Sequence, residues 1–137
     1  MTARSLALAA AIPQNPPDVL LVEDDHAVRE VVQELLEAEG YRVLPARNGR
    51  EALDRLRGMA APRMILADLM MPEMNGSELS AELARDPRLS GIPMVLMSAD
   101  VGLEQKAKHL AVAAVLQKPV ALERLLDTVR RVWNGAS

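Results

Sequence analysis

The chain has 137 residues, half of them hydrophobic, and a formal net charge of −3, which suits one domain with a packed core. It contains no cysteine and no basic block, which argues against disulfides, a thiol nucleophile and direct binding of nucleic acid. No apolar run approaches the ~20 residues needed to cross a bilayer, so we expect a cytoplasmic protein that does not contact membranes.

The first residues differ in composition from the rest. A short apolar stretch, Leu6–Ile12, is followed within five residues by three prolines. The stretch is similar to a signal peptide only loosely, because it is short. We expect residues 1–17 to form a flexible leader, residues 18–134 the folded domain and residues 135–137 a tail.

A buried strand is predicted at the start of the domain, followed by an amphipathic helix. Val19–Val22 is a run of four apolar residues. His26–Glu39 carries apolar residues at positions i, i+3, i+4, i+7 and i+8, which form one face of a helix. Asp25 is placed to cap this helix and Gly40 to end it.

The next four elements continue the alternation of strand and helix. Tyr41–Pro45 predicts a strand, and its proline favours an edge position. Arg50–Met59 has its apolar residues on one side and predicts a helix. Met64–Ala67 is an uninterrupted apolar run, typical of a buried strand. After the turn signal Asn75-Gly76, Ser77–Arg85 predicts a short helix.

The last four elements complete a regular pattern. Pro93–Met97 and Val112–Leu116 predict strands. The helix between them, about Val101–Leu110, has the weakest periodicity, whereas Ala121–Trp133 has a clear apolar face. Five strands and five helices in alternation, with continuous apolar strands, predict an α/β fold with a doubly wound five-stranded parallel sheet. Because the chain ends after the last helix, we expect no effector domain.

Chemically active side chains follow four of the five predicted strands. Ligands in such folds bind beyond the carboxyl ends of the strands, so residues at these positions converge. They are Glu23, Asp24 and Asp25 after the first strand, Asp68 after the third, Ser98 after the fourth and Lys118 after the fifth.

Clustered carboxylates need positive charge nearby. At ~5 Å and an effective dielectric of ~20, each like-charged pair costs about 3 kcal/mol. Lys118 supplies one positive charge, and a hard divalent cation such as Mg²⁺ suits a site with oxygen ligands only. A metal, a lysine and a hydroxyl around Asp68 form an arrangement for phosphoryl transfer, with Asp68 as the nucleophile.

Four segments together resemble the receiver domain of bacterial response regulators. They are Val19-Leu-Leu-Val-Glu-Asp-Asp25, Met64-Ile-Leu-Ala-Asp-Leu-Met-Met-Pro-Glu-Met-Asn-Gly76, Met97-Ser-Ala99 and Gln117-Lys-Pro119. The resemblance runs from about Asp18 to Trp133. It implies a flavodoxin-like (βα)5 sandwich with strand order 2-1-3-4-5.

The resemblance also implies roles for particular residues. Asp68 would be the phosphoacceptor, with Ser98 and Lys118 contacting the phosphoryl group. Mg²⁺ would be bound by Asp24, by Asp68 and by the backbone carbonyl of Met70, with Glu23 acting through water. The donor would be a sensor histidine kinase or a histidine phosphotransfer protein, and the Lys118-Pro119 peptide bond would be cis.

The chain departs from the family at the positions that couple phosphorylation to output. Val115 stands where an aromatic residue is usual, Ala111 where glycine is usual, and Val120 where an aromatic residue is frequent. We therefore expect signalling to use movement of Ser98 and of the Val101–Leu110 helix. Output would be contact with an unknown downstream protein through the fourth helix, fifth strand and fifth helix, with these candidate residues: Lys106, Lys108, Arg124, Arg130 and Arg131.

The sequence is open to three functional interpretations. The first is a phosphoacceptor that catalyses only its own phosphorylation and dephosphorylation. The second, a phosphatase of the haloacid dehalogenase type, needs an aspartate where Met70 stands. The third, a degenerate receiver that binds partners without phosphorylation, is favoured only by Val115. The sequence leaves a homodimer open.

Overall fold

The computed structural model describes residues 16–71, 74–100, 102, 105, 108 and 112–135. The predicted leader therefore lies almost entirely outside the described residues. Most of the predicted tail and of the predicted Val101–Leu110 helix lie outside them as well.

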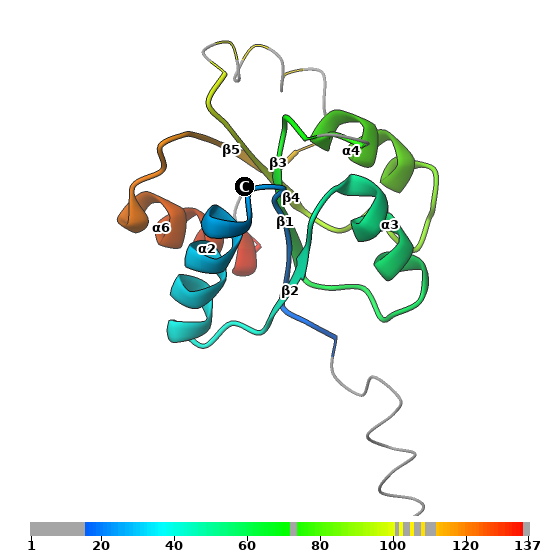
Figure 1. Cartoon of the computed structure of the whole chain (residues 1–137). Helices are drawn as coiled ribbons and strands as arrows, with labels where there is room; N and C mark the ends of the chain where they lie inside the picture. The colour runs from blue at the N-terminus through cyan, green and yellow to red at the C-terminus, as the bar shows by residue number, and fades with distance from the viewer. Residues whose placement is uncertain are drawn as a thin grey trace, which may run out of the picture.

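Five parallel strands form one sheet (Figure 1). Their order is β2-β1-β3-β4-β5, which confirms the predicted topology. Every residue of β1, β3 and β4 is buried, as the continuous apolar runs indicated, and β2 lies at an edge. The strands are β1 (Val19–Val22), β2 (Val43–Ala46), β3 (Met64–Asp68), β4 (Met94–Ser98) and β5 (Ala114–Gln117).

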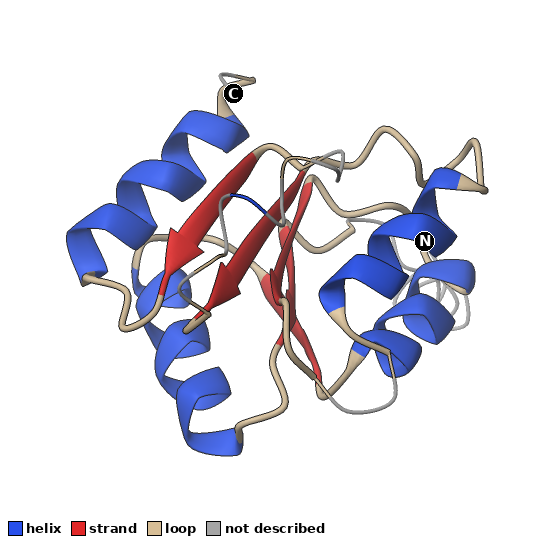
Figure 2. Cartoon of the chain, turned by 90° about the horizontal axis from the view of Figure 1, so that it is seen from above, coloured by secondary structure: helices blue, strands red, loops and turns tan. Residues whose placement is uncertain are grey.

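Helices cover both faces of the sheet, with α2 and α6 on one face and α3 and α4 on the other (Figures 1 and 2). Each face carries its own cluster of buried apolar side chains, so the doubly wound sandwich is confirmed. The helices are α2 (His26–Ala38), α3 (Gly49–Arg57), α4 (Gly76–Ala84) and α6 (Leu122–Trp133).

Helix ends follow the local sequence closely. The Asp25 side chain accepts a hydrogen bond from the Val28 N–H and caps α2, as predicted. Gly40 follows α2 with φ +94°, a conformation that favours glycine. Asn75 and Glu78 form a reciprocal capping box at the start of α4, which determines the residue at which that helix begins.

An aromatic cluster lies near the amino-terminal ends of the strands. The rings of Tyr41 and Trp133 meet edge to face, with centroids 5.3 Å apart. The Arg63 guanidinium stacks 3.8 Å from the centroid of the Trp133 ring and donates to the Trp133 carbonyl at 3.1 Å. The cluster joins the end of α6 to the residue before β3.

Candidate functional site

The carboxyl edge of the sheet brings the predicted site residues together. Asp68 and Ser98 are the last residues of β3 and β4, and both are buried. Glu23, directly after β1, has no exposed surface, whereas its neighbour Asp24 is exposed. Asp25 does not join the cluster, because its carboxylate caps α2.

Lys118 connects two of the carboxylates. Its Nζ donates to Glu23 Oε1 at 2.7 Å and to Asp68 Oδ2 at 2.9 Å. Its backbone N–H donates to the Ser98 carbonyl at 2.8 Å, so the β4–β5 pairing fixes the base of the side chain. The Lys118-Pro119 peptide bond is cis, which confirms that prediction.

The pKa values of two residues in this cluster are raised, for different reasons. Burial of Glu23 raises its pKa to about 7, although hydrogen bonds from Lys118 and from the Asp25 N–H act against the rise. Burial alone would lower the pKa of Lys118, but its hydrogen bonds to Glu23 and Asp68 outweigh burial and raise it. Lys118 is therefore a fixed cation at neutral pH.

The three acidic residues form a cluster suited to a cation. Carboxylate oxygens of Glu23, Asp24 and Asp68 lie within 4.8 Å of one another. Both oxygens of Glu23 accept hydrogen bonds, from Lys118 and from the Asp25 N–H, and both oxygens of Asp68 do so as well, from Lys118 and from the Met70 N–H. The donors are all oxygen, so the cluster fits a hard divalent cation.

A small pocket gives access to Asp68 from solvent. It has a volume of about 310 Å³ and is lined by Asp68, Met70, Ser98, Ala99, Asp100 and Lys118. The Met70 N–H donates to Asp68 Oδ1 at 3.1 Å, and the Asp100 N–H donates to Ser98 Oγ at 3.0 Å. The backbone after β3 and β4 thus orients both side chains.

The sequence reasoning missed two residues of the site. Ala99 lines the pocket beside Ser98; it lies within the segment Met97-Ser-Ala99 that carries the resemblance, but no site role was assigned to it. Arg29 donates from its guanidinium to the Glu23 carbonyl at 2.8 Å. Nothing in the helical pattern of α2 distinguishes this arginine from one facing solvent.

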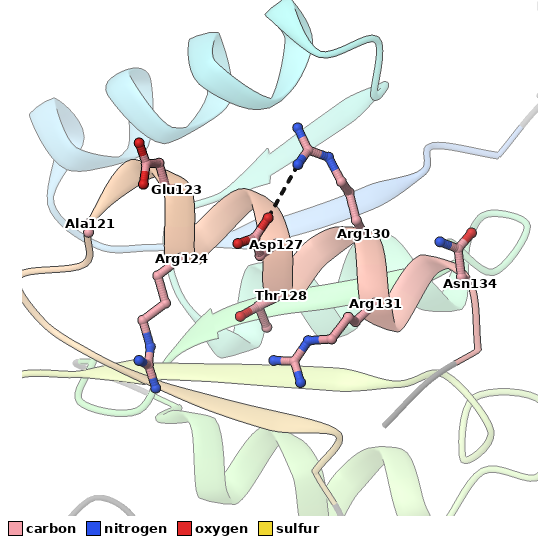
Figure 3. Close-up of a pocket in the computed structure, with 8 residues that line it drawn as sticks. All are labelled: Ala121, Glu123, Arg124, Asp127, Thr128, Arg130, Arg131 and Asn134. Carbon is pink, nitrogen blue, oxygen red and sulfur yellow. Dashed lines mark hydrogen bonds and ion pairs between the residues drawn. The ribbon is translucent and has the colours of Figure 1, made fainter.

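The predicted output residues lie partly on the outer surface of α6. A shallow cavity of about 770 Å³ runs along that helix. Figure 3 shows Arg124 and Arg131 directed to the same side of α6, whereas Arg130 points away from them. Arg130 pairs with Asp127 at 3.3 Å and with Glu39 at 3.2 Å. Lys108 is exposed, and Lys106 lies outside the described residues.

Comparison with known proteins gives consistent matches over most of the chain. The family model of the response regulator receiver domain matches residues 19–130. The polar-differentiation response regulator DivK of Brucella anthropi is 33% identical over 123 residues, which are 88% of this chain and 99% of that protein.

Two solved structures show the same architecture. The chemotaxis protein CheY4 of Vibrio cholerae is 30% identical, with a TM-score of 0.77 over 86% of this chain and 99% of that one. The receiver domain of a signal transduction histidine kinase from Syntrophus aciditrophicus is 31% identical, with a TM-score of 0.78 over 88% and 92% of the two chains.

Proposed function

The chain belongs to the response regulator receiver domain family, and we propose that it accepts a phosphoryl group on the carboxylate of Asp68. The donor would be a phosphohistidine on a sensor histidine kinase or on a histidine phosphotransfer protein. The observation that carries the proposal is the ion pair of 2.9 Å between Asp68 and Lys118, next to two further carboxylates at the carboxyl edge of the sheet.

The chemistry follows from the contacts of Asp68. One of its carboxylate oxygens would form a bond to phosphorus while the bond from phosphorus to the donor's imidazole nitrogen breaks, and that nitrogen keeps the electron pair. The Lys118 ammonium would stabilise charge on the phosphoryl oxygens. Ser98 Oγ accepts from the Asp100 N–H, so its own hydroxyl hydrogen can be donated to a phosphoryl oxygen.

A magnesium ion fits the acidic cluster. Asp24 and Asp68 would bind it directly together with the backbone carbonyl of Met70, and Glu23 would act through water. When bound there, Mg²⁺ would offset the negative charge of the carboxylates and of the phosphoryl oxygens.

Signalling rather than turnover of a substrate would be the outcome. The protein would catalyse only its own phosphorylation and dephosphorylation, in the cytoplasm, and act through contact with a downstream protein. In the described part of the chain no helix is long and apolar enough to cross a membrane. The α6 surface that carries Arg124 and Arg131 is the proposed contact surface; partner binding unchanged by charge reversal there would place output elsewhere.

Output would also depend on how phosphorylation of Asp68 changes the conformation of the α6 surface. Val115 is half-buried in β5 and packs against the core cluster beneath α3 and α4, so no aromatic ring at this position can rotate between core and surface. We propose that movement of Ser98 and of residues 101–110 takes the place of the rotation of an aromatic side chain at position 115. Backbone amide shifts in residues 101–110 on adding beryllofluoride would support this, and unchanged shifts would contradict it.

Intact mass after incubation with acetyl phosphate tests the main proposal. We expect one added phosphoryl group that requires both Mg²⁺ and Asp68, so that an Asp68→Asn variant gains none. A folded protein that gains no phosphoryl group and forms no stable beryllofluoride complex would instead be a binding module independent of phosphorylation. The valine at position 115 is the observation that favours this second candidate.

A further inference from the structure

Three arginine side chains line a pocket at the carboxyl end of the edge strand β2. The pocket has a volume of about 280 Å³ and is lined by Arg29, Pro45, Ala46, Arg47, Glu51 and Arg55. It shares no lining residue with the phosphoacceptor pocket around Asp68. It is therefore a second candidate site, and the chemistry proposed for Asp68 does not use it.

The pocket brings together arginines from three parts of the chain. Arg29 lies near the start of α2, Arg47 directly follows β2, and Arg55 lies in α3. Helices α2 and α3 cover opposite faces of the sheet (Figures 1 and 2), and residues from both line this pocket because it lies at the edge strand. The fold thus places three guanidinium groups around one opening.

The lining carries an excess of positive charge. Its three arginines contribute +3 and Glu51 contributes −1, which leaves +2. Burial acts to raise the pKa of Glu51, but hydrogen bonds from Arg47 outweigh burial and lower it, so Glu51 is ionised at neutral pH. The chain as a whole carries −3, so the excess is a local feature and not a consequence of composition.

One carboxylate does not saturate three guanidinium groups. Glu51 accepts from Arg47 Nε at 3.0 Å and from Arg55 Nη2 at 3.3 Å. Arg29 is held separately, because it donates to the Glu23 carbonyl at 2.8 Å. Each guanidinium has five N–H donors, so all three arginines keep donors for a ligand in the pocket.

A phosphate monoester matches this pocket better than a carboxylate does. Its two negative charges balance the +2 of the lining, and its three terminal oxygens can accept from several guanidinium groups at once. A carboxylate has one charge and two oxygens, so an acidic side chain would leave positive charge unbalanced. The volume of about 280 Å³ is close to the lower end of ligand pockets, roughly 300 Å³, which suits a small molecule.

We propose that Arg29, Arg47 and Arg55 form a binding site for a small phosphorylated molecule at the end of β2. The acidic cluster around Asp68 repels anions when no metal is bound, so the ligand is directed to the arginines. Binding at this site does not rest on the proposed function, since it needs no transfer to Asp68.

Titration of the ¹⁵N-labelled full chain with ethyl phosphate tests the proposal. EDTA is present so that no metal draws the anion to the acidic cluster, and the ionic strength is held constant with sodium chloride. At about pH 8 a phosphate monoester carries close to two negative charges. We expect saturable shifts at residues 29, 46–51 and 55, with a dissociation constant on the order of 1 mM, and unchanged amides at Ser98 and Lys118.

Acetate in a parallel titration separates the two classes of anion. It carries a carboxylate and one charge, and we expect it to bind at least tenfold more weakly than ethyl phosphate. Equal binding of the two anions would assign the pocket to an acidic segment of a partner protein and would overturn the proposal. Shifts that do not saturate would overturn it as well, because they indicate diffuse attraction without a site.

Four variants relate binding to the charge of the lining. Arg47→Gln and Arg55→Gln each remove one positive charge and should weaken binding of ethyl phosphate at least fivefold. Glu51→Gln raises the charge of the lining from +2 to +3 and should strengthen binding at least twofold. Arg57→Gln is the matched control, because Arg57 is an exposed arginine of the same helix that does not line the pocket.

The pattern across the variants decides the outcome. All four changes are confined to α3 or to the residue after β2, and the amide spectrum of β1 and β3 checks that the domain stays folded. We expect the control to bind as the unmodified protein does. Equal weakening in Arg47→Gln and Arg57→Gln, or weaker binding in Glu51→Gln, would overturn the proposal.

Discussion

Asp24 and Glu23 are adjacent in sequence but have opposite environments. Glu23 is fully buried and bonded to Lys118. Asp24 is exposed, and among the described residues it has no hydrogen bond or ion pair, although its carboxylate lies within 4.8 Å of those of Glu23 and Asp68. Without metal, Asp24 therefore contributes repulsion to the folded state.

Replacing Asp24 by asparagine should make the metal-free protein more stable. The change removes repulsion worth about 1 kcal/mol for an exposed carboxylate, while it also removes a direct metal ligand. We expect urea unfolding in EDTA to show a gain of about 1 kcal/mol, and the stabilisation by Mg²⁺ seen in the unmodified protein to disappear. Equal stability of the two proteins in EDTA would show that the carboxylates do not repel one another measurably.

The buried Glu23 carboxyl should make stability depend on pH. Its pKa is about 7 in the folded protein and 4.5 ordinarily, so the folded state binds this proton more tightly than the unfolded chain does. The resulting stabilisation is complete below pH 4.5 and is lost as pH rises to about 7, a change of about 3 kcal/mol.

Urea unfolding at a series of pH values in EDTA measures this effect. Glu23→Gln, which cannot ionise, should remove the decline between pH 4.5 and 7. Glu51→Gln is a control in which the pH dependence should have the opposite sign. Burial acts to raise the pKa of Glu51, but its hydrogen bonds from Arg47 outweigh burial and lower it. The contribution of Glu51 to the free energy of unfolding is therefore lost as pH falls. A decline that persists in Glu23→Gln would assign the proton to another group.

The sequence allowed prediction of which residues gather at this site, but not of how they pair. Asp68 and Ser98 end strands and Lys118 follows one, and parallel strands bring their carboxyl ends to one side of the sheet. That Lys118 contacts Glu23 at 2.7 Å, and that Arg29 donates to the Glu23 carbonyl, depends on side-chain conformations and sheet twist, which strand periodicity does not contain. The metal roles of Asp24, Asp68 and Met70 stay predictions.

Among the elements, α2 depends strongly on its N-cap residue, Asp25. It has one fully buried side chain, so packing holds it less firmly than the other helices, and the Asp25 cap is correspondingly important. Asp25→Ala should lower the free energy of unfolding by about 1 kcal/mol. Asp25→Asn, which keeps the accepting oxygen, should cost only a few tenths of that. Chemical unfolding measures both, and an equal loss would point to charge rather than capping.

The boundaries of elements were predicted less well than their existence. Three strands start and end one or two residues later than their apolar runs: β2, β4 and β5. The ladder continues into Asp68, Ser98 and Gln117 because each is paired with the neighbouring strand, Asp68 with Met97 and Ser98 with Gln117. Hydrogen bonding of the backbone, which side-chain hydrophobicity does not report, sets these ends.

At the scale of the molecule, the described residues form two apolar layers that share one sheet. Leu56 belongs to the cluster beneath α3 and α4, and Leu36 to the cluster beneath α2 and α6; both are fully buried. Strand alternation predicted two covered faces, whereas the strand order came from family resemblance, because periodicity alone does not say which strands are neighbours.

Separate layers predict additive effects on stability. Leu36→Ala and Leu56→Ala should each cost about 3 kcal/mol, and the double variant should cost the sum within about 0.5 kcal/mol, since the two side chains belong to different clusters on opposite faces of the sheet. Urea unfolding of the four proteins in a double-mutant cycle checks this. A coupling above 1 kcal/mol would mean that the sheet transmits relaxation from one layer to the other.

The position of Trp133 has a spectroscopic consequence. The only tryptophan of the chain stacks with the Arg63 guanidinium and meets the Tyr41 ring edge to face, at the end of the strands opposite to Asp68. Its emission will report the loss of tertiary structure during unfolding but will hardly change when the acidic edge binds a metal or is phosphorylated. An optical assay of those events needs a fluorophore introduced at the other edge of the sheet, and the native indole then serves as its internal reference.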